Sequence, residues 1–156
     1  MAAIRPEPVE SPGARLLLTE YQAEVYRRWS GPPPAEAMPA GAPADSELAA
    51  PHGVFLLARL DGRPAGCAGV RALGTGPGTG ELKRLYVRPS ARGHGLGRLL
   101  LAAAEDAARA LGHTRLRLDT MAELAEARAL YTAAGYADIP PYNTNPYAAH
   151  WLEKAL

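Results

Sequence analysis

The chain has 156 residues, with 17 basic and 16 acidic side chains and a formal charge of +1 at neutral pH. This length is most simply one domain, residues 1–156, with a buried core. The balanced charge predicts no nucleic-acid or membrane-surface partner. The single cysteine, Cys67, excludes an intramolecular disulfide, and its apolar neighbours predict a thiol packed inside a strand.

The N-terminal residues MAAIRPEPVE contain two prolines and lack the apolar region of a signal peptide. No apolar run approaches the roughly 20 residues of a membrane-spanning helix. These observations predict a cytoplasmic protein. We expect a short first strand over residues 2–5, and then a helix that begins after Ser11, a typical N-cap residue followed by proline.

A proline- and alanine-rich segment, residues 31–51, follows this helix. Its composition favours an extended connection across the surface, with one helical turn over residues 45–50. Beyond it, two apolar runs flank the dipeptide Asp61-Gly62, which is typical of a two-residue hairpin turn. A third strand, ELKRLYVRP, should continue the antiparallel arrangement.

The segment LGRLLLAAAEDAARAL places its leucines and alanines at helical spacing, and Gly112 occupies the position of a C-cap glycine. The next segment, TRLRLDT, is a predicted strand with Leu116 and Leu118 on one face. A strand, a helix and a further strand in this order predict a parallel βαβ unit. The fold class is therefore α/β, or α+β if the antiparallel half is given more weight.

Thr120 and Glu123 fit a capping box, which predicts a helix from this point to Ala134, with Gly135 as its stop. After it we expect a short strand, a proline-rich loop and a last strand. The four histidines lack the spacing of metal ligands, so no metal site is expected.

Three glycines at alternate positions, Gly93, Gly95 and Gly97, precede the leucine-rich helix. A loop between a strand end and a helix start directs unpaired amide N–H groups to one point, where the helix dipole adds about half a positive charge. This arrangement favours a phosphate. Arg98 and Leu99 exclude the P-loop pattern, and Arg98 also excludes the dinucleotide-binding glycine pattern. A glycine-rich connection without a ligand is the alternative.

The spacing of Arg92, Gly95 and Gly97, together with the downstream segment ALYTAAGY, resembles the GNAT N-acetyltransferase superfamily. The resemblance covers most of the chain and is tightest over residues 81–136. It implies a mixed central sheet with helices on both faces, in which antiparallel hairpins precede the βαβ unit. It also implies acetyl-CoA as the acetyl donor.

The resemblance further implies that backbone groups of Leu85, Tyr86 and Val87 bind the pantetheine arm like an added strand. The loop amides would then hold the pyrophosphate. The loop residues implied in cofactor binding are Arg92, Gly93, His94, Gly95, Leu96, Gly97 and Arg98.

Two residues match the catalytic positions of the family. Glu81 lies eleven residues before Arg92, where many GNAT enzymes carry a general base, and Tyr131 matches the tyrosine acid. A base offsets the cost of deprotonating an amine, and a phenol is normally protonated at neutral pH. Glu81 could instead be a solvated residue at a strand start, and Tyr131 a core residue.

The segment IPPYNTNP is similar to the PPYxxNP tail of some family members, and we expect its Tyr142 and Asn145 to face the acceptor pocket. A rigid surface turn is the alternative. The resemblance as a whole implies direct transfer of an acetyl group from acetyl-CoA to a primary amine of a small acceptor, in a ternary complex. The alternative is a non-catalytic acyl-CoA-binding or sensing module. Homodimers are common in the family, and the sequence shows neither an interface nor the acceptor's identity.

Overall fold

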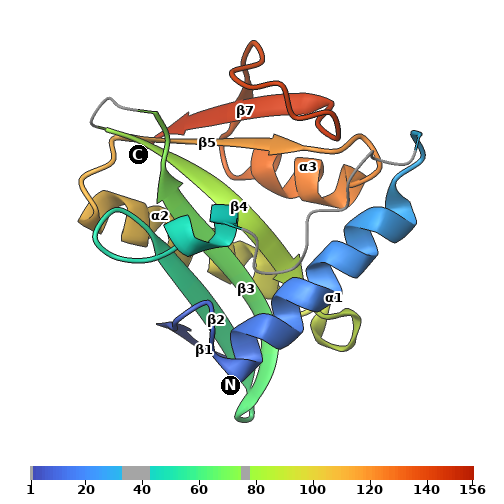
Figure 1. Cartoon of the computed structure of the whole chain (residues 1–156), viewed down its shortest axis with the longest axis vertical. Coiled ribbons are helices and arrows are strands. Elements are labelled where there is room, and N and C mark those ends of the chain that lie inside the picture. Colours follow the sequence, from blue (N-terminus) through green and yellow to red (C-terminus); the bar gives the residue numbers. More distant parts are fainter. Residues whose placement is uncertain (1, 33–42, 75–77) are drawn as a thin grey trace.

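A computed structural model of the protein describes residues 2–32, 43–74 and 78–156. Within these residues, seven strands form one mixed sheet in the order β1-β2-β3-β4-β5-β7-β6 (Figure 1). The strands are β1 (Ala2–Pro6), β2 (Val54–Leu60), β3 (Arg63–Ala72), β4 (Thr79–Val87), β5 (Arg115–Thr120), β6 (Ala137–Asp138) and β7 (His150–Ala155). The helices are α1 (Pro12–Arg28), α2 (Leu96–Ala110) and α3 (Ala125–Ala133), with 3-10 turns η1 (Pro43–Glu47) and η2 (Pro89–Ala91). The predicted mixed α/β architecture is confirmed.

The antiparallel half of the sheet, β1 to β4, follows from local turn chemistry. Asp61 and Gly62 join β2 to β3 with φ values of 51° and 79°. Both values lie in the left-handed region, as a type I′ hairpin turn requires. At the start of α1, the Ser11 hydroxyl accepts a hydrogen bond from the Ala14 amide at 3.1 Å, so the predicted N-cap is confirmed.

The segments β4, α2 and β5 form the predicted parallel crossover. Thr79 pairs with Arg115 in the parallel register, and α2 packs its apolar stripe on β2, β3 and β4 with Leu100 fully buried. Gly112 follows the helix with φ 91°, the left-handed conformation of a glycine that ends a helix.

The two faces of the sheet carry separate cores. Helices α2 and α3 cover one face, where Leu116 and Leu118 are buried. Helix α1 and turn η1 cover the other face, which is in front in Figure 1. There the Cys67 thiol is fully buried as predicted, and burial raises its pKa. Because successive strand residues point to opposite faces, the buried leucines of β4 and β5 leave alternate polar residues on the α1 face.

The predicted capping box is wrong. Thr120 is the last residue of β5, and α3 begins only at Ala125, without a hydrogen bond from a capping side chain. The Glu123 carboxylate instead accepts hydrogen bonds from the amide and the hydroxyl of Ser30, just after α1. A contact between distant parts of the chain thus takes the carboxylate that the local cap would have used.

Part of the proline- and alanine-rich segment 31–51 lies outside the described residues. The helical turn expected over residues 45–50 is the 3-10 turn η1, at Pro43–Glu47. Directly after it, Leu48 packs on β3 at Gly69, where a Cβ would lie 2.7 Å from Leu48 Cδ1. In the part of the chain that the structure describes, no helix combines the length and apolar character needed to cross a membrane.

Candidate active site

The site begins where β4 and β5 separate. The two strands pair from Thr79 to Glu81 on the β4 side, and no further pairing joins them among the described residues. The register of β4 with β3 also shifts at this point, where Arg84 has a φ of 58°. Such a bulge bends one strand away from its neighbour. The last residues of β4 therefore have backbone groups that β5 does not use.

A cavity of about 420 Å³ lies at this opening. The end of β4, the glycine loop (residues 92–97), α1 and α3 meet there. Nine of the ten predicted cofactor-binding residues line it, and His94, which is exposed, does not. The lining residues are Tyr21, Glu24, Val25, Leu85, Tyr86, Val87, Arg92, Gly93, Gly95, Leu96, Gly97, Arg98, Leu124, Glu126, Ala127 and Leu130.

The glycine loop presents bare backbone to this cavity. Gly93 and Gly95 have φ values of 85° and 77°, in the left-handed region that side chains disfavour. Gly95 is the N-cap of α2 and supplies no side chain to bond the first-turn amides. The first amides of a helix have no partner within the helix itself. Their N–H groups and the helix dipole therefore suit a phosphate group at this point.

The two loop arginines differ in how they are held. The Arg92 guanidinium donates to the Val87 carbonyl at 2.9 Å and to the Glu24 carboxylate at 2.7 Å. It therefore ties the loop to β4 and α1. Arg98 is exposed in the first turn of α2 and lines the cavity. Of the two side chains, Arg98 has the greater freedom to meet a phosphate.

Tyr131 lies beside the cavity rather than in its wall. Its neighbours Ala127 and Leu130 on α3 line the cavity, whereas Tyr131 is buried with its ring edge-on to Tyr136 at 5.9 Å. Burial raises the pKa of Tyr131, and the nearby charges of Tyr21 and Asp119 raise it further. The phenol therefore stays protonated at neutral pH, as a proton donor must.

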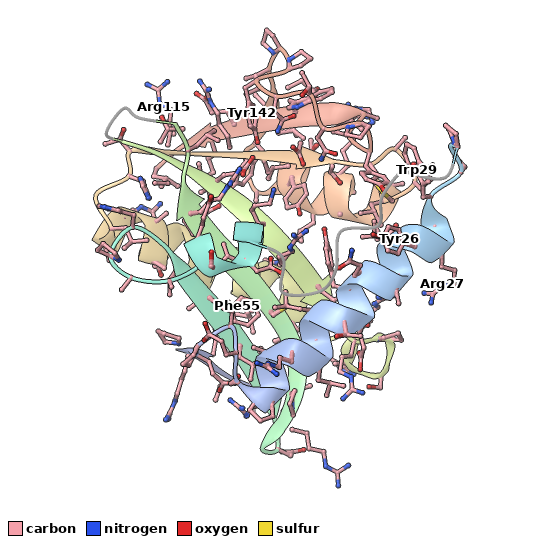
Figure 2. The ribbon with its side chains drawn as sticks, in the orientation of Figure 1. Tyr26, Arg27, Trp29, Phe55, Arg115 and Tyr142 are labelled. Atoms are coloured by element: carbon pink, nitrogen blue, oxygen red, sulfur yellow. The ribbon has the colours of Figure 1, made fainter. Side chains whose placement is uncertain are left out.

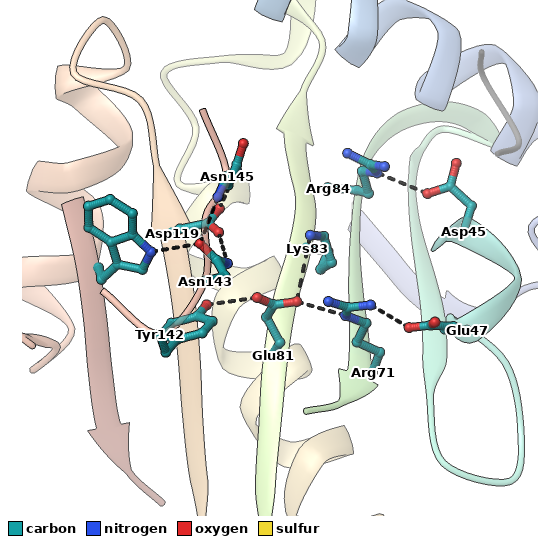
Figure 3. Close-up of polar contacts among 11 residues, drawn as sticks. Asp45, Glu47, Arg71, Glu81, Lys83, Arg84, Asp119, Tyr142, Asn143 and Asn145 are labelled. Carbon is teal, nitrogen blue, oxygen red and sulfur yellow. Dashed lines mark hydrogen bonds and ion pairs between the residues drawn. The ribbon is translucent and has the colours of Figure 1, made fainter. Parts of the chain in front are cut away.

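Glu81 is buried on the α1 face and is only 1% exposed (Figure 3). Arg71 Nε donates to its Oε1 at 2.7 Å, and Lys83 Nζ lies 3.6 Å from the same oxygen. The Tyr142 hydroxyl donates to its Oε2 at 2.7 Å. The alternative that Glu81 is a solvated residue at a strand start is therefore wrong. Its hydrogen bond with Tyr142 connects it to the tail loop, residues 139–149.

The tail loop packs over β5 and the end of α1. The Tyr142 ring lies against the Arg117 guanidinium, 5.7 Å from ring centre to charge. At the other end of the loop, the rings of Tyr147 and Trp29 meet at 5.0 Å. Figure 2 shows Trp29 at the C-terminal end of α1 and Tyr142 above β5. The tail loop is thus held against β5 at one end and against the residue that follows α1 at the other.

Sequence reasoning gave no role to Asp119, although the structure places it at the centre of a polar network. Asn143 Nδ2 donates to its Oδ2 at 2.6 Å, and Asn145 Nδ2 lies 3.3 Å from its Oδ1 (Figure 3). Asn145 thus binds Asp119, together with the unpredicted Asn143. The alternation of Leu116 and Leu118 with polar residues was the one available signal, because it sets Asp119 on the face opposite the buried leucines.

Comparisons with known proteins agree on one family. A family model described as the acetyltransferase (GNAT) family matches residues 17–136. An IAA acetyltransferase from Azospirillum brasilense is 43% identical over 112 residues, or 70% of this chain and 72% of that protein. An uncharacterised N-acetyltransferase from Schizosaccharomyces pombe is 43% identical over 97 residues, or 62% of this chain and 59% of that protein.

A solved structure shows the same fold. It is N-acetylglutamate synthase from Neisseria gonorrhoeae, in complex with coenzyme A and N-acetyl-glutamate. The match has a TM-score of 0.73 at 20% identity and covers all of this chain and 35% of that one.

Proposed function

The chain belongs to the GNAT acetyltransferase family, and from that premise we propose that it transfers an acetyl group from acetyl-CoA directly to a primary amine in a ternary complex. The observation that supports this proposal is the cavity, because the first residues of α2, which suit a phosphate, and the end of β4 that does not pair with β5 both line it. The acceptor would enter from the α1 face, beside Glu81 and the tail loop.

The residues present fit acetyl-CoA. The amides of residues 92–98 would hold the pyrophosphate, and Gly93 and Gly95 leave its approach open because a Cβ at either position would meet no atom within 4 Å. The free backbone groups of Leu85, Tyr86 and Val87 would hold the pantetheine arm. A solved GNAT-fold structure with bound coenzyme A supports this assignment.

The acceptor must lose a proton before it can attack. For an alkylamine with a pKa of about 10.4, deprotonation at pH 7 costs about 4.6 kcal/mol. The buried Glu81 carboxylate would accept this proton through Tyr142, whose hydroxyl already donates to Glu81. Tyr142 would receive a proton from the acceptor nitrogen as its own proton passes to Glu81.

Bound acetyl-CoA supplies an activated thioester, whose carbon–sulfur bond breaks as the new carbon–nitrogen bond forms. Tyr131 would give its proton to the departing sulfur, and the proton that the attacking nitrogen loses as the amide forms would restore the phenol. Its raised pKa keeps that proton available at neutral pH. Tyr142 would thus help to remove a proton from the acceptor, and Tyr131 would supply a proton to the leaving group.

The relatives do not identify one acceptor, because the names IAA acetyltransferase and N-acetylglutamate synthase refer to different compounds. The test is therefore a panel of amines, amino acids, aminoglycosides and peptides with acetyl-CoA, with released thiol as the readout. We expect turnover with one class, and a loss of kcat in Glu81→Gln and Tyr131→Phe. Tyr26→Phe, which removes a hydroxyl from α1 outside the cavity lining, is the matched control.

Two other outcomes would change the proposal. Tight CoA binding without thiol release from any acceptor would favour the acyl-CoA-binding or sensing module. No CoA binding at all would overturn the assignment of the cavity.

A further inference from the structure

The charged residues on the α1 face around the opening are mostly paired with one another. The Arg84 Nε lies 2.9 Å from the Asp45 carboxylate. The Arg117 Nε lies 2.6 Å from the Glu153 carboxylate on β7. Arg115 also lies 3.9 Å from Glu153, so each charged side chain in these two groups has a partner of opposite sign.

A second group on the same face is neutral. Arg71 and Lys83 share the Glu81 carboxylate, and Arg71 also contacts Glu47. Asp119, by contrast, forms no ion pair with any described residue. The residues outside the described ranges do not supply the missing cation as a side chain, because 33–42 and 75–77 contain no lysine or arginine.

The two amides at Asp119 can only donate to it. Asn143 Oδ1 accepts from the Trp151 indole at 2.9 Å and from the Asn145 backbone amide at 3.2 Å, so its NH2 group faces Asp119. Asn145 Oδ1 accepts from the Tyr147 amide at 3.1 Å, which turns its NH2 group the same way. The network thus holds Asp119 as an acceptor in one orientation without neutralising its charge.

Asp119 lies on the face of the sheet that carries Glu81 and the tail loop. It is two residues beyond Arg117, the last residue of β5 that pairs with β4. Its negative charge contributes to the raised pKa of Tyr21, Tyr131 and Tyr142. Asn143, which binds Asp119, directly follows Tyr142 in the tail loop, so a cation held by Asp119 would lie beside the residue next to Tyr142.

We propose that Asp119 binds the ammonium group of the acceptor, which makes the acceptor an aliphatic amine that is positively charged at neutral pH. The transfer step that follows binding rests on the proposed function. The ammonium would give Asp119 the ion-pair partner that no described side chain provides, and the amides of Asn143 and Asn145 would keep the carboxylate in place. Arylamines and alcohols, which are uncharged at neutral pH, would lack this interaction.

The test measures binding apart from turnover. The protein is saturated with CoA, which cannot donate an acetyl group, and titrated calorimetrically with n-butylamine and 2-phenylethylamine. The matched neutral probes are n-butanol, 2-phenylethanol and aniline. We expect at least one amine to bind, and both the neutral probes and the Asp119→Asn variant to show at least tenfold weaker binding. Glu10→Gln removes an exposed carboxylate before α1 that likewise has no ion pair among the described residues, and this variant should bind the amine as the native protein does.

The CoA affinity and Tm of each variant show whether it is folded. Asp119→Glu is the second variant, and because it keeps the charge it should bind the amine more tightly than Asp119→Asn. Equal amine affinity in the native protein and Asp119→Asn would overturn the proposal, as would neutral probes that bind as tightly as amines, or no amine binding at all. Amines that bind through Asp119 but are never acetylated would instead overturn the proposed function and leave the ammonium site standing.

Discussion

We expect the substitution Gly97→Ala to weaken cofactor binding without lowering the stability of the protein. Gly97 lies in the first turn of α2, where an added Cβ would lie 3.5 Å from Leu130 Cδ2 and 3.9 Å from Val87 Cγ2. These are ordinary contacts, and alanine is favoured over glycine in a helix by up to about 1 kcal/mol. The free protein should therefore be as stable as the native chain, or up to about 1 kcal/mol more stable.

The same methyl group would stand between the α2 amides and a bound pyrophosphate. A hydrogen bond to a charged group contributes about 1.5–3 kcal/mol, so the loss of one should weaken CoA binding about 10- to 100-fold. Isothermal titration calorimetry with CoA gives the affinity, and thermal unfolding gives the stability. The variant should show weaker binding with an unchanged or higher Tm.

The matched control is Gly112→Ala, at the other end of α2. Gly112 has a φ of 91°, and a Cβ there would meet nothing within 4 Å. Alanine in this left-handed conformation costs about 1–2 kcal/mol, which lowers Tm by about 2–8 °C, while CoA affinity should not change. If Gly97→Ala bound CoA as tightly as the native protein, the assignment of the glycine loop to the pyrophosphate would be refuted.

Three further variants test the chemistry and the packing. Tyr131→Phe should lower kcat about 100-fold or more with an unchanged CoA Kd; an unchanged kcat would remove Tyr131 as the acid. Gly69→Ala should cost about 1–3 kcal/mol by crowding Leu48, and a double-mutant cycle in urea with Leu48→Ala should recover part of that cost; additive effects would contradict the contact. The hydrogen bond from Arg59 lowers the pKa of Glu7, so its stabilisation is present above pH about 5 and is lost as the pH falls through the lowered value. Arg59→Gln should therefore flatten this acid dependence in urea unfolding between pH 3 and 7, and an unchanged slope would show that the pair does not couple to folding.

The fold could be predicted where the signals are local. The Asp61-Gly62 turn fixes the register of its hairpin because both residues adopt left-handed conformations that few other residues tolerate. The apolar spacing of α2 and the glycine after it are similarly local. The capping box failed because Glu123 bonds Ser30 across the fold, a contact that no pattern of neighbouring residues contains.

In the candidate site, too, the local features could be predicted and the contacts between distant residues could not. The glycine loop was recognisable because its conformation depends on glycines close together in the chain, and nine of the ten predicted residues line one cavity. The sequence did not show that Glu81 is buried between Arg71 and Tyr142, or that Asp119 is held by Asn143 and Asn145.

The sequence by itself thus determined the turns, the helix ends and the bare backbone of residues 92–97, because each depends on the conformational preferences of neighbouring residues. Only the tertiary structure decided which charged side chains form ion pairs with one another. The sheet brings β4, β5 and the tail loop together, and the bond from Tyr142 to Glu81 joins residues 61 positions apart. Burial and ion pairing depend on that assembly, so the setting of Asp119, which binds Asn143 and Asn145 but forms no ion pair with a described residue, is visible only in the folded chain.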